Sequence, residues 1–278
     1  MKYLKLLRLD EHYPVLGCVL ASSLYLQQRG MWIIWWSLGA ISFSIIAFVT
    51  NELVDRNDVD VYSWNKIHVG KLTKLDNRVL AFLFVFFIIS GFVFSYLSGF
   101  FWWGIAFFII GVLYSLKPFR LKSRFALDIL AQVACAFVIP FLAPIYSLGT
   151  PGSSLLLLLN ACLILWAIVF PYQLADYKAD VKARLKSTHV VLGMRKSLLL
   201  GLLLVLGGVI LFFYFRIFSL APWLSILLVL VGYTAYKYVQ WLRMSNLNSQ
   251  TLSMQKYAGT MKPLSQLLVP YVLIWMLL

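Results

Sequence analysis

Charged residues are scarce in this chain, and acidic residues are the scarcest of them. Only 12% of the 278 residues are charged, and 10 Asp and Glu stand against 24 Lys and Arg. A soluble domain carries roughly 25% charged residues, so this composition excludes an ordinary soluble enzyme. With 62% hydrophobic residues, the chain is predicted to be an all-α integral membrane protein.

Cysteine and histidine are also few, which removes several kinds of site. No CxxC spacing and no Cys/His cluster occurs, and all three cysteines lie within apolar runs: Cys18, Cys135 and Cys162. We expect them to be small core residues rather than disulfide, metal or nucleophile positions. The three histidines are too dispersed for a metal triad.

Common catalytic signatures are missing as well. No GxGxxG, Walker, HExxH or GxSxG pattern occurs in a fitting context. The sequence therefore lacks support for a nucleotide-binding fold, a zinc protease or a serine hydrolase.

What the sequence does contain is a series of long apolar runs. A helix needs roughly 17 to 25 apolar residues to cross a bilayer. Nine windows approach this length and predict nine transmembrane helices in a single domain, 1–278: 13–28, 31–50, 79–97, 99–116, 125–147, 153–175, 197–216, 220–242 and 262–278.

The basic residues divide unevenly between the two sides of this arrangement. All of the 24 Lys and Arg except Arg29 and Arg216 fall in the N-terminus or in the even-numbered connections. The positive-inside rule therefore places the N-terminus and those connections in the cytoplasm. This topology explains the net charge of +14, so we expect membrane lipids as partners and no nucleic acid. The predicted location is the cell inner (plasma) membrane, as a multi-pass protein.

Six of the ten acidic residues gather in two short segments that follow apolar windows. The first is NELVDRNDVD at 51–60, and the second is DYKAD at 176–180. On a helix, Asn51, Asp55 and Asp58 share one face, and Asp176 and Asp180 repeat the one-turn spacing. Carboxylates so arranged repel one another unless a cation lies between them, and oxygen ligands suit Mg²⁺ that bridges to a phosphate.

Basic side chains occupy the cytoplasmic connections near both acidic segments. YSLKPFRLKSR spans 114–124, and a second basic stretch follows Asp180. Metal-binding carboxylates faced by such loops would form a site for a polyanion such as pyrophosphate. Asp128, four residues after Arg124, can pair with that arginine and is left out of the site. His189 follows the second acidic segment and could touch pyrophosphate or act as a base, but the favoured expectation is a surface histidine near a charged loop. The candidate pyrophosphate ligands are Tyr114, Lys117, Arg120, Lys122 and Lys186.

These features together resemble the UbiA-type intramembrane prenyltransferase family. That family has nine helices, an NDxxDxxxD motif after the second helix and a DxxxD motif after the sixth. The corresponding segments here are NELVDRNDVD, DYKADVKARLKSTHVVLG and the tyrosine-containing basic loop YSLKPFRLK. The chain departs from the pattern at Glu52, which replaces an Asp, at Val59, which leaves Asp58 or Asp60 as the third carboxylate, and at Arg184, where Gly is usual.

The resemblance implies a helical bundle with an active-site cavity that faces the cytoplasm. It also implies Mg²⁺ and a prenyl diphosphate, whose pyrophosphate departs before an acceptor attacks the prenyl carbon. Tyr177 joins Tyr114 as a hydrogen-bond donor to pyrophosphate, and Asp55, Asp176 and Asp180 are the catalytic carboxylates. The metal ligands so implied are Asn51, Glu52, Asp55, Asp58, Asp176 and Asp180.

Three functions remain open from the sequence. The leading one is transfer of a polyprenyl chain to an acceptor, either an aromatic quinone precursor or a lipid or pigment such as a carotenoid. The second is a terpene cyclase that uses the same diphosphate site. A transporter ranks far below both, because its carboxylates would be expected near mid-membrane on broken helices. The oligomeric state is not predicted.

Overall fold

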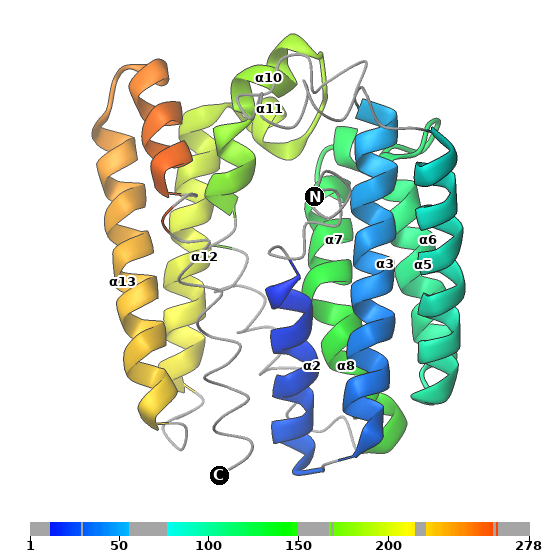
Figure 1. Ribbon diagram of the computed structural model, residues 1–278. Coiled ribbons are helices and arrows are strands. Elements are labelled where there is room, and N and C mark those ends of the chain that lie inside the picture. Colours follow the sequence, from blue (N-terminus) through cyan, green and yellow to red (C-terminus); the bar gives the residue numbers. More distant parts are fainter. Residues whose placement is uncertain are drawn as a thin grey trace.

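The computed structural model of this protein describes residues 12–28, 30–55, 77–149, 167, 170–214, 221–257 and 260. Throughout these ranges every regular element is a helix and no strand occurs, which confirms the all-α prediction. The long helices run along one common direction and form a bundle (Figure 1).

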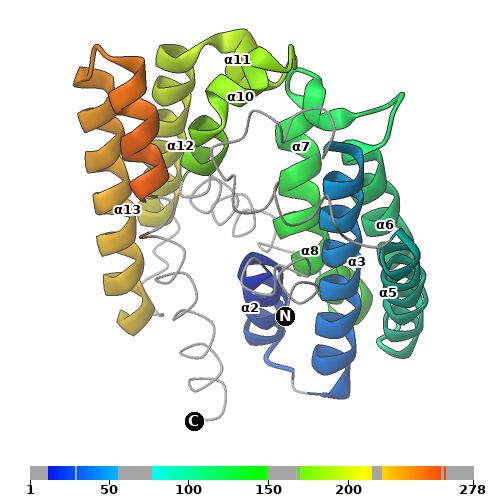
Figure 2. The ribbon, with the colours of Figure 1, turned by 45° about the horizontal axis from the view of Figure 1, so that its top comes forward.

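Six α-helices of the described ranges lie within residues 12–149. They are α2 (Tyr13–Leu26), α3 (Met31–Asp55), α5 (Asn77–Leu97), α6 (Phe101–Ser115), α7 (Leu127–Val133) and α8 (Ile139–Leu148). Two long helices stand opposite them in both views, α12 (Met194–Tyr214) and α13 (Ala221–Arg243). Two short helices, α10 (Tyr177–Lys182) and α11 (Thr188–Leu192), lie across the upper end (Figures 1 and 2).

The predicted apolar windows correspond closely to these helices. Three helical stretches in the described ranges are long and apolar enough to cross a membrane: Met31–Asn51, Arg78–Leu97 and Leu127–Leu148. Phe101–Ser115 is a shorter apolar helix. The window 262–278 lies outside the described residues, and 153–175 lies largely outside them, so the number of nine spans stays a prediction.

The outer face of α5 exposes a continuous row of large apolar side chains. Phe82 is 66% exposed and Ile89 is 59% exposed, with Val85, Phe86 and Val93 on the same side of the helix. A soluble protein rarely leaves such a row open to water, because contiguous apolar surface favours association or insertion into lipid. The row is the surface expected for a helix in contact with lipid tails.

Two prolines shape the helix that runs from α7 to α8. Pro140 has no N–H to donate to the preceding turn, and the residues just before it, Ala134–Val138 (η4), are π-helical. Pro144 removes the usual donor for the Pro140 carbonyl four residues earlier. Trp36 from α3 replaces that donor, because its indole Nε1–H bonds the Pro140 oxygen at 3.1 Å. The tryptophan is fully buried.

Aromatic side chains are the largest fully buried residues of the bundle core. One cluster surrounds Phe43 of α3, which meets Phe92, Phe107 and Phe108 edge-on or tilted. In the other half, Trp241 packs edge-on against Tyr238 and Tyr257.

The pair α12–α13 packs closely at a glycine. A Cβ at Gly201 would collide with the ring of Tyr238, so the absent side chain sets the distance between the two helices.

Of the cysteines, Cys18 is buried in the core as expected, Cys135 is half-buried, and Cys162 lies outside the described residues.

Candidate active site

The first acidic motif begins on α3. The helix continues beyond the apolar window to Asp55, so Asn51 and Asp55 are one helical turn apart, as predicted. The Asn51 Oδ1 accepts hydrogen bonds from the ammonium of Lys122 at 2.7 Å and from the hydroxyl of Ser115 at 2.9 Å. The side chains of Glu52 and Asp55 and the whole of Asp58 lie outside the described part of the chain.

The loop after α6 delivers Lys122 to this asparagine. Arg120 adopts a left-handed φ of 38°, and its carbonyl accepts the backbone N–H of Ser123 at 2.9 Å. The resulting 3₁₀ turn, η3 (Leu121–Ser123), buries Lys122 to 9% exposure, whereas Lys117 remains exposed. The structure therefore brings one predicted pyrophosphate ligand, Lys122, against one predicted metal ligand, Asn51.

The second acidic motif forms one helical turn at the same end of the bundle. Asp176 precedes α10, and its carbonyl accepts the backbone N–H of Asp180 at 3.0 Å. In both views α10 lies at the same end of the bundle as the end of α3 (Figures 1 and 2). The spacing of Asp176 and Asp180 is thus the predicted one, and the second motif lies at the same end of the bundle as the end of α3.

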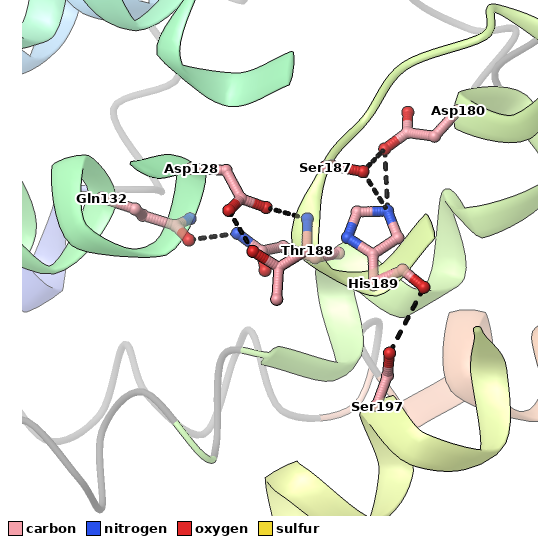
Figure 3. Close-up of polar contacts among 8 residues, drawn as sticks. Asp128, Gln132, Asp180, Ser187, Thr188, His189 and Ser197 are labelled. Atoms are coloured by element: carbon pink, nitrogen blue, oxygen red, sulfur yellow. Dashed lines mark hydrogen bonds and ion pairs between the residues drawn. The ribbon is translucent and has the colours of Figure 1, made fainter. Parts of the chain in front are cut away.

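Asp180 contacts a histidine that the sequence analysis placed on the surface. The imidazole Nε2 of His189 lies 2.8 Å from Oδ2 of Asp180, and the hydroxyl of Ser187 donates to the same oxygen at 3.4 Å (Figure 3). The surface prediction is wrong, because His189 is only 4% exposed. The sequence placed it near charged residues but carried no sign that α11 folds back onto α10.

Asp128 joins α7 to α11. Its Oδ2 accepts the backbone N–H of Thr188 at 2.8 Å, and its Oδ1 accepts the Thr188 hydroxyl (Figure 3). The expected pairing with Arg124 is wrong, since that guanidinium donates to the Pro118 carbonyl at 3.2 Å. Asp128 is 2% exposed, so a buried carboxylate holds the segment that carries His189.

The two tyrosines proposed for pyrophosphate lie near the second motif. Tyr114, close to the end of α6, is within electrostatic range of the carboxylates of Asp128 and Asp180. The ring of Tyr177 has its centroid 6.2 Å from that of His189. Lys186, from the same region, has an exposed side chain.

The backbone conformation of Arg184, just after α10, explains why glycine is usual at this position in the motif that this segment resembles. Arg184 has φ of +55°, a left-handed conformation that costs a residue with a Cβ about 1–2 kcal/mol. Glycine adopts it without that penalty. The backbone N–H groups of Arg184 and Leu185 donate to the carbonyls of Val181 and Asp180, which closes the turn with arginine in the left-handed conformation.

The donor atoms at this end of the bundle are chemically suited to a hard divalent cation. Asn51, Asp176 and Asp180 offer oxygen only, which is the ligand type of Mg²⁺. Among the described side chains no three His, Cys, Asp or Glu gather into one group. The carboxylates of the first motif are not among the described side chains. The described donors, Asn51, Asp176 and Asp180, are of the predicted ligand type.

Comparison with known proteins agrees with this arrangement. A UbiA homologue from Archaeoglobus fulgidus, solved with GPP and Mg²⁺, shares 21% identity and a TM-score of 0.72, with 100% of each chain covered. The same homologue solved with DMAPP and Mg²⁺ also gives a TM-score of 0.72, over 99% of each chain. The structure of a digeranylgeranylglyceryl phosphate synthase covers 99% of this chain and 96% of its own, at 16% identity and a TM-score of 0.61.

At these low identities the structural similarity establishes the fold alone, and the sequence profile establishes the family. A comparison with curated protein sequences gives no match. The profile of the UbiA prenyltransferase family matches residues 14–259, which is most of the chain. With its apolar helices and its two acidic motifs at one end of the bundle, this membrane protein belongs to the UbiA prenyltransferase family and is a prenyl-transferring enzyme.

Proposed function

We propose that this protein transfers a polyprenyl chain from a prenyl diphosphate to a hydrophobic or aromatic acceptor, with Mg²⁺ at the two acidic motifs. The observation that carries the proposal is the position of the end of α3 and of α10 at the same end of an apolar bundle, with Lys122 bonded to Asn51. The relatives solved with GPP, DMAPP and Mg²⁺ support the same donor and metal.

The metal ligands are divided between the two motifs. Asp176 and Asp180 hold one Mg²⁺, and a second set holds the other: Asn51, Glu52, Asp55 and Asp58. Bound Mg²⁺ would offset the charge of the leaving pyrophosphate. Asp60 remains the alternative to Asp58, since both flank Val59.

The basic residues bind and orient the pyrophosphate. Lys122 is buried next to Asn51, so its ammonium is fixed before substrate arrives and needs little reorganisation. Arg120, Lys117 and Lys186 contribute charge from the surrounding loops. Tyr114 and Tyr177 donate hydrogen bonds to pyrophosphate oxygens.

The apolar bundle receives the prenyl chain and excludes water. Water that reached the electron-deficient prenyl carbon would compete with the acceptor, so a dry site favours transfer. We propose nine spans with the N-terminus and both motifs on the cytoplasmic side of the cell inner (plasma) membrane, and a single domain over 1–278. The acceptor is an aromatic quinone precursor or a lipid or pigment such as a carotenoid.

The test is a transfer assay with purified protein in nanodiscs. Radiolabelled geranyl, farnesyl and geranylgeranyl diphosphates are supplied with a panel of aromatic and lipid acceptors, in Mg²⁺ or in EDTA. We expect pyrophosphate release that requires Mg²⁺, with label joined to an acceptor. Release with a cyclised hydrocarbon and no acceptor requirement would overturn transfer in favour of a cyclase.

Variants test the site independently of the acceptor. Asp55→Asn and Asp180→Asn should each lower kcat/KM by at least about 100-fold, which is about 2.7 kcal/mol of transition-state stabilisation. Asp76→Asn is the matched control, because it removes a carboxylate outside both motifs. Near-normal turnover in both motif variants would contradict the metal assignment.

A further inference from the structure

His189 makes its main polar contact with a proposed metal ligand. Its Nε2 is 2.8 Å from Asp180 Oδ2, and its ring is buried. An ionised carboxylate has no proton to donate, so the imidazole must donate through Nε2–H. One oxygen of Asp180 is therefore held by the ring, while Oδ1 remains directed elsewhere.

The backbone around His189 is anchored from two other helices. The preceding residue, Thr188, is bonded to Asp128 of α7. The His189 carbonyl accepts the hydroxyl of Ser197 in α12 at 3.3 Å (Figure 3). The backbone that carries the His189 ring is therefore fixed independently of Asp180. A side chain held in this way can set the orientation of the Asp180 carboxylate.

The second ring nitrogen of His189 is buried at a cost in free energy. His189 Nδ1 is buried and has no hydrogen-bond partner within the part of the chain that the structure describes. Burying an unsatisfied polar atom costs about 1–3 kcal/mol, a cost that an aliphatic side chain of similar size would avoid. The contact between Nε2 and Asp180 is the gain that offsets it.

We propose that His189 is a positioning residue for the second acidic motif: it holds Oδ2 of Asp180 and so directs Oδ1 toward the divalent cation. The inference rests on the proposed function, because it takes Asp180 as a metal ligand. Partners that orient the ligands of a metal typically contribute about 10–100-fold to metal affinity. Nothing in the spacing of the DYKAD motif requires such a partner.

The experiment measures metal binding without turnover. Thermal unfolding is followed in nanodiscs with geranyl thiodiphosphate, an unreactive donor analogue, while Mg²⁺ is titrated; the readout is the Mg²⁺ concentration that gives half of the stabilisation. His189→Leu should raise this concentration about 10–100-fold. His189→Gln, which keeps an N–H near the Nε2 position, should recover most of the affinity, and maximal stabilisation at saturating Mg²⁺ should be retained.

Ser187→Ala is the control: it removes the 3.4 Å contact to the same Asp180 oxygen and a 3.3 Å contact to His189 Nε2, but keeps the 2.8 Å contact between His189 and Asp180. It should bind Mg²⁺ nearly as the unaltered protein does. Equal Mg²⁺ dependence in His189→Leu and the unaltered protein would overturn the role of His189, as would an equal loss in the Leu and Gln variants. If the unaltered protein showed no Mg²⁺-dependent stabilisation, the metal site itself would be refuted, and this role with it.

Discussion

The contact between Asp128 and Thr188 should be one of the strongest polar links between the two halves of the bundle. The informative perturbation is Asp128→Ala, which removes the acceptor of two hydrogen bonds from Thr188. Asp128 is 2% exposed, so water cannot readily replace the lost carboxylate. The substitution leaves the backbone N–H of Thr188 buried without its acceptor.

The magnitude follows from these contacts. A hydrogen bond to a charged group contributes about 1.5–3 kcal/mol, and an orphaned buried donor costs about 1–3 kcal/mol. Because the two bonds share one carboxylate and are not additive, we expect a total loss of about 3–5 kcal/mol. For chains of about 150–250 residues, 1 kcal/mol lowers the unfolding temperature by about 2–4 °C, so the midpoint should fall by at least about 6 °C.

The assay is thermal unfolding in nanodiscs, followed by tryptophan fluorescence. Asp128→Asn keeps an acceptor for one donor and should lose roughly half as much stability. Thr188→Ser keeps both donors and serves as the matched control. If Asp128→Ala unfolded at the same temperature as Thr188→Ser, the reasoning that this buried carboxylate joins α7 to α11 would be refuted.

Three further substitutions test the backbone and the packing, each by the unfolding midpoint in the same nanodiscs. Arg184→Gly should stabilise by about 0.5–1 kcal/mol, because relief of the left-handed strain exceeds the entropy of an added glycine; a lower midpoint would contradict the strain. Trp36→Phe should cost about 1–3 kcal/mol, since the Pro140 carbonyl loses its donor, and an unchanged midpoint would refute that role. Gly201→Leu should cost about 1–3 kcal/mol or more by forcing Tyr238 away, whereas Gly201→Leu with normal stability would mean that α12 and α13 are not closely packed there.

Much of the fold could be predicted from the sequence because its signals are local. Apolar runs of bilayer length correspond to α3, α5, α6 and the α7–α8 helix. The one-turn spacing of Asp176 and Asp180 likewise appears as one turn. Helix periodicity and apolar length depend on residues close together in the chain, so a single sequence is enough to read them.

The exposure and the partners of polar residues could not be predicted in the same way. His189 was expected on the surface and is buried, and Asp128 was expected to pair with Arg124 and bonds Thr188 instead. The Arg124 pairing was inferred from sequence separation alone. A local rule of that kind fails when a distant segment supplies better geometry and removes the site from water.

The sequence by itself determined the membrane-type composition, the apolar helices and the two acidic motifs that mark the family. Only the tertiary structure decided which side chains meet at the site. Lys122 reaches Asn51 across 71 residues, and Thr188 reaches Asp128 across 60. Such contacts depend on how the turns between helices orient each helix end. Because a buried polar group without a hydrogen-bond partner costs free energy, each of these groups needs a partner there.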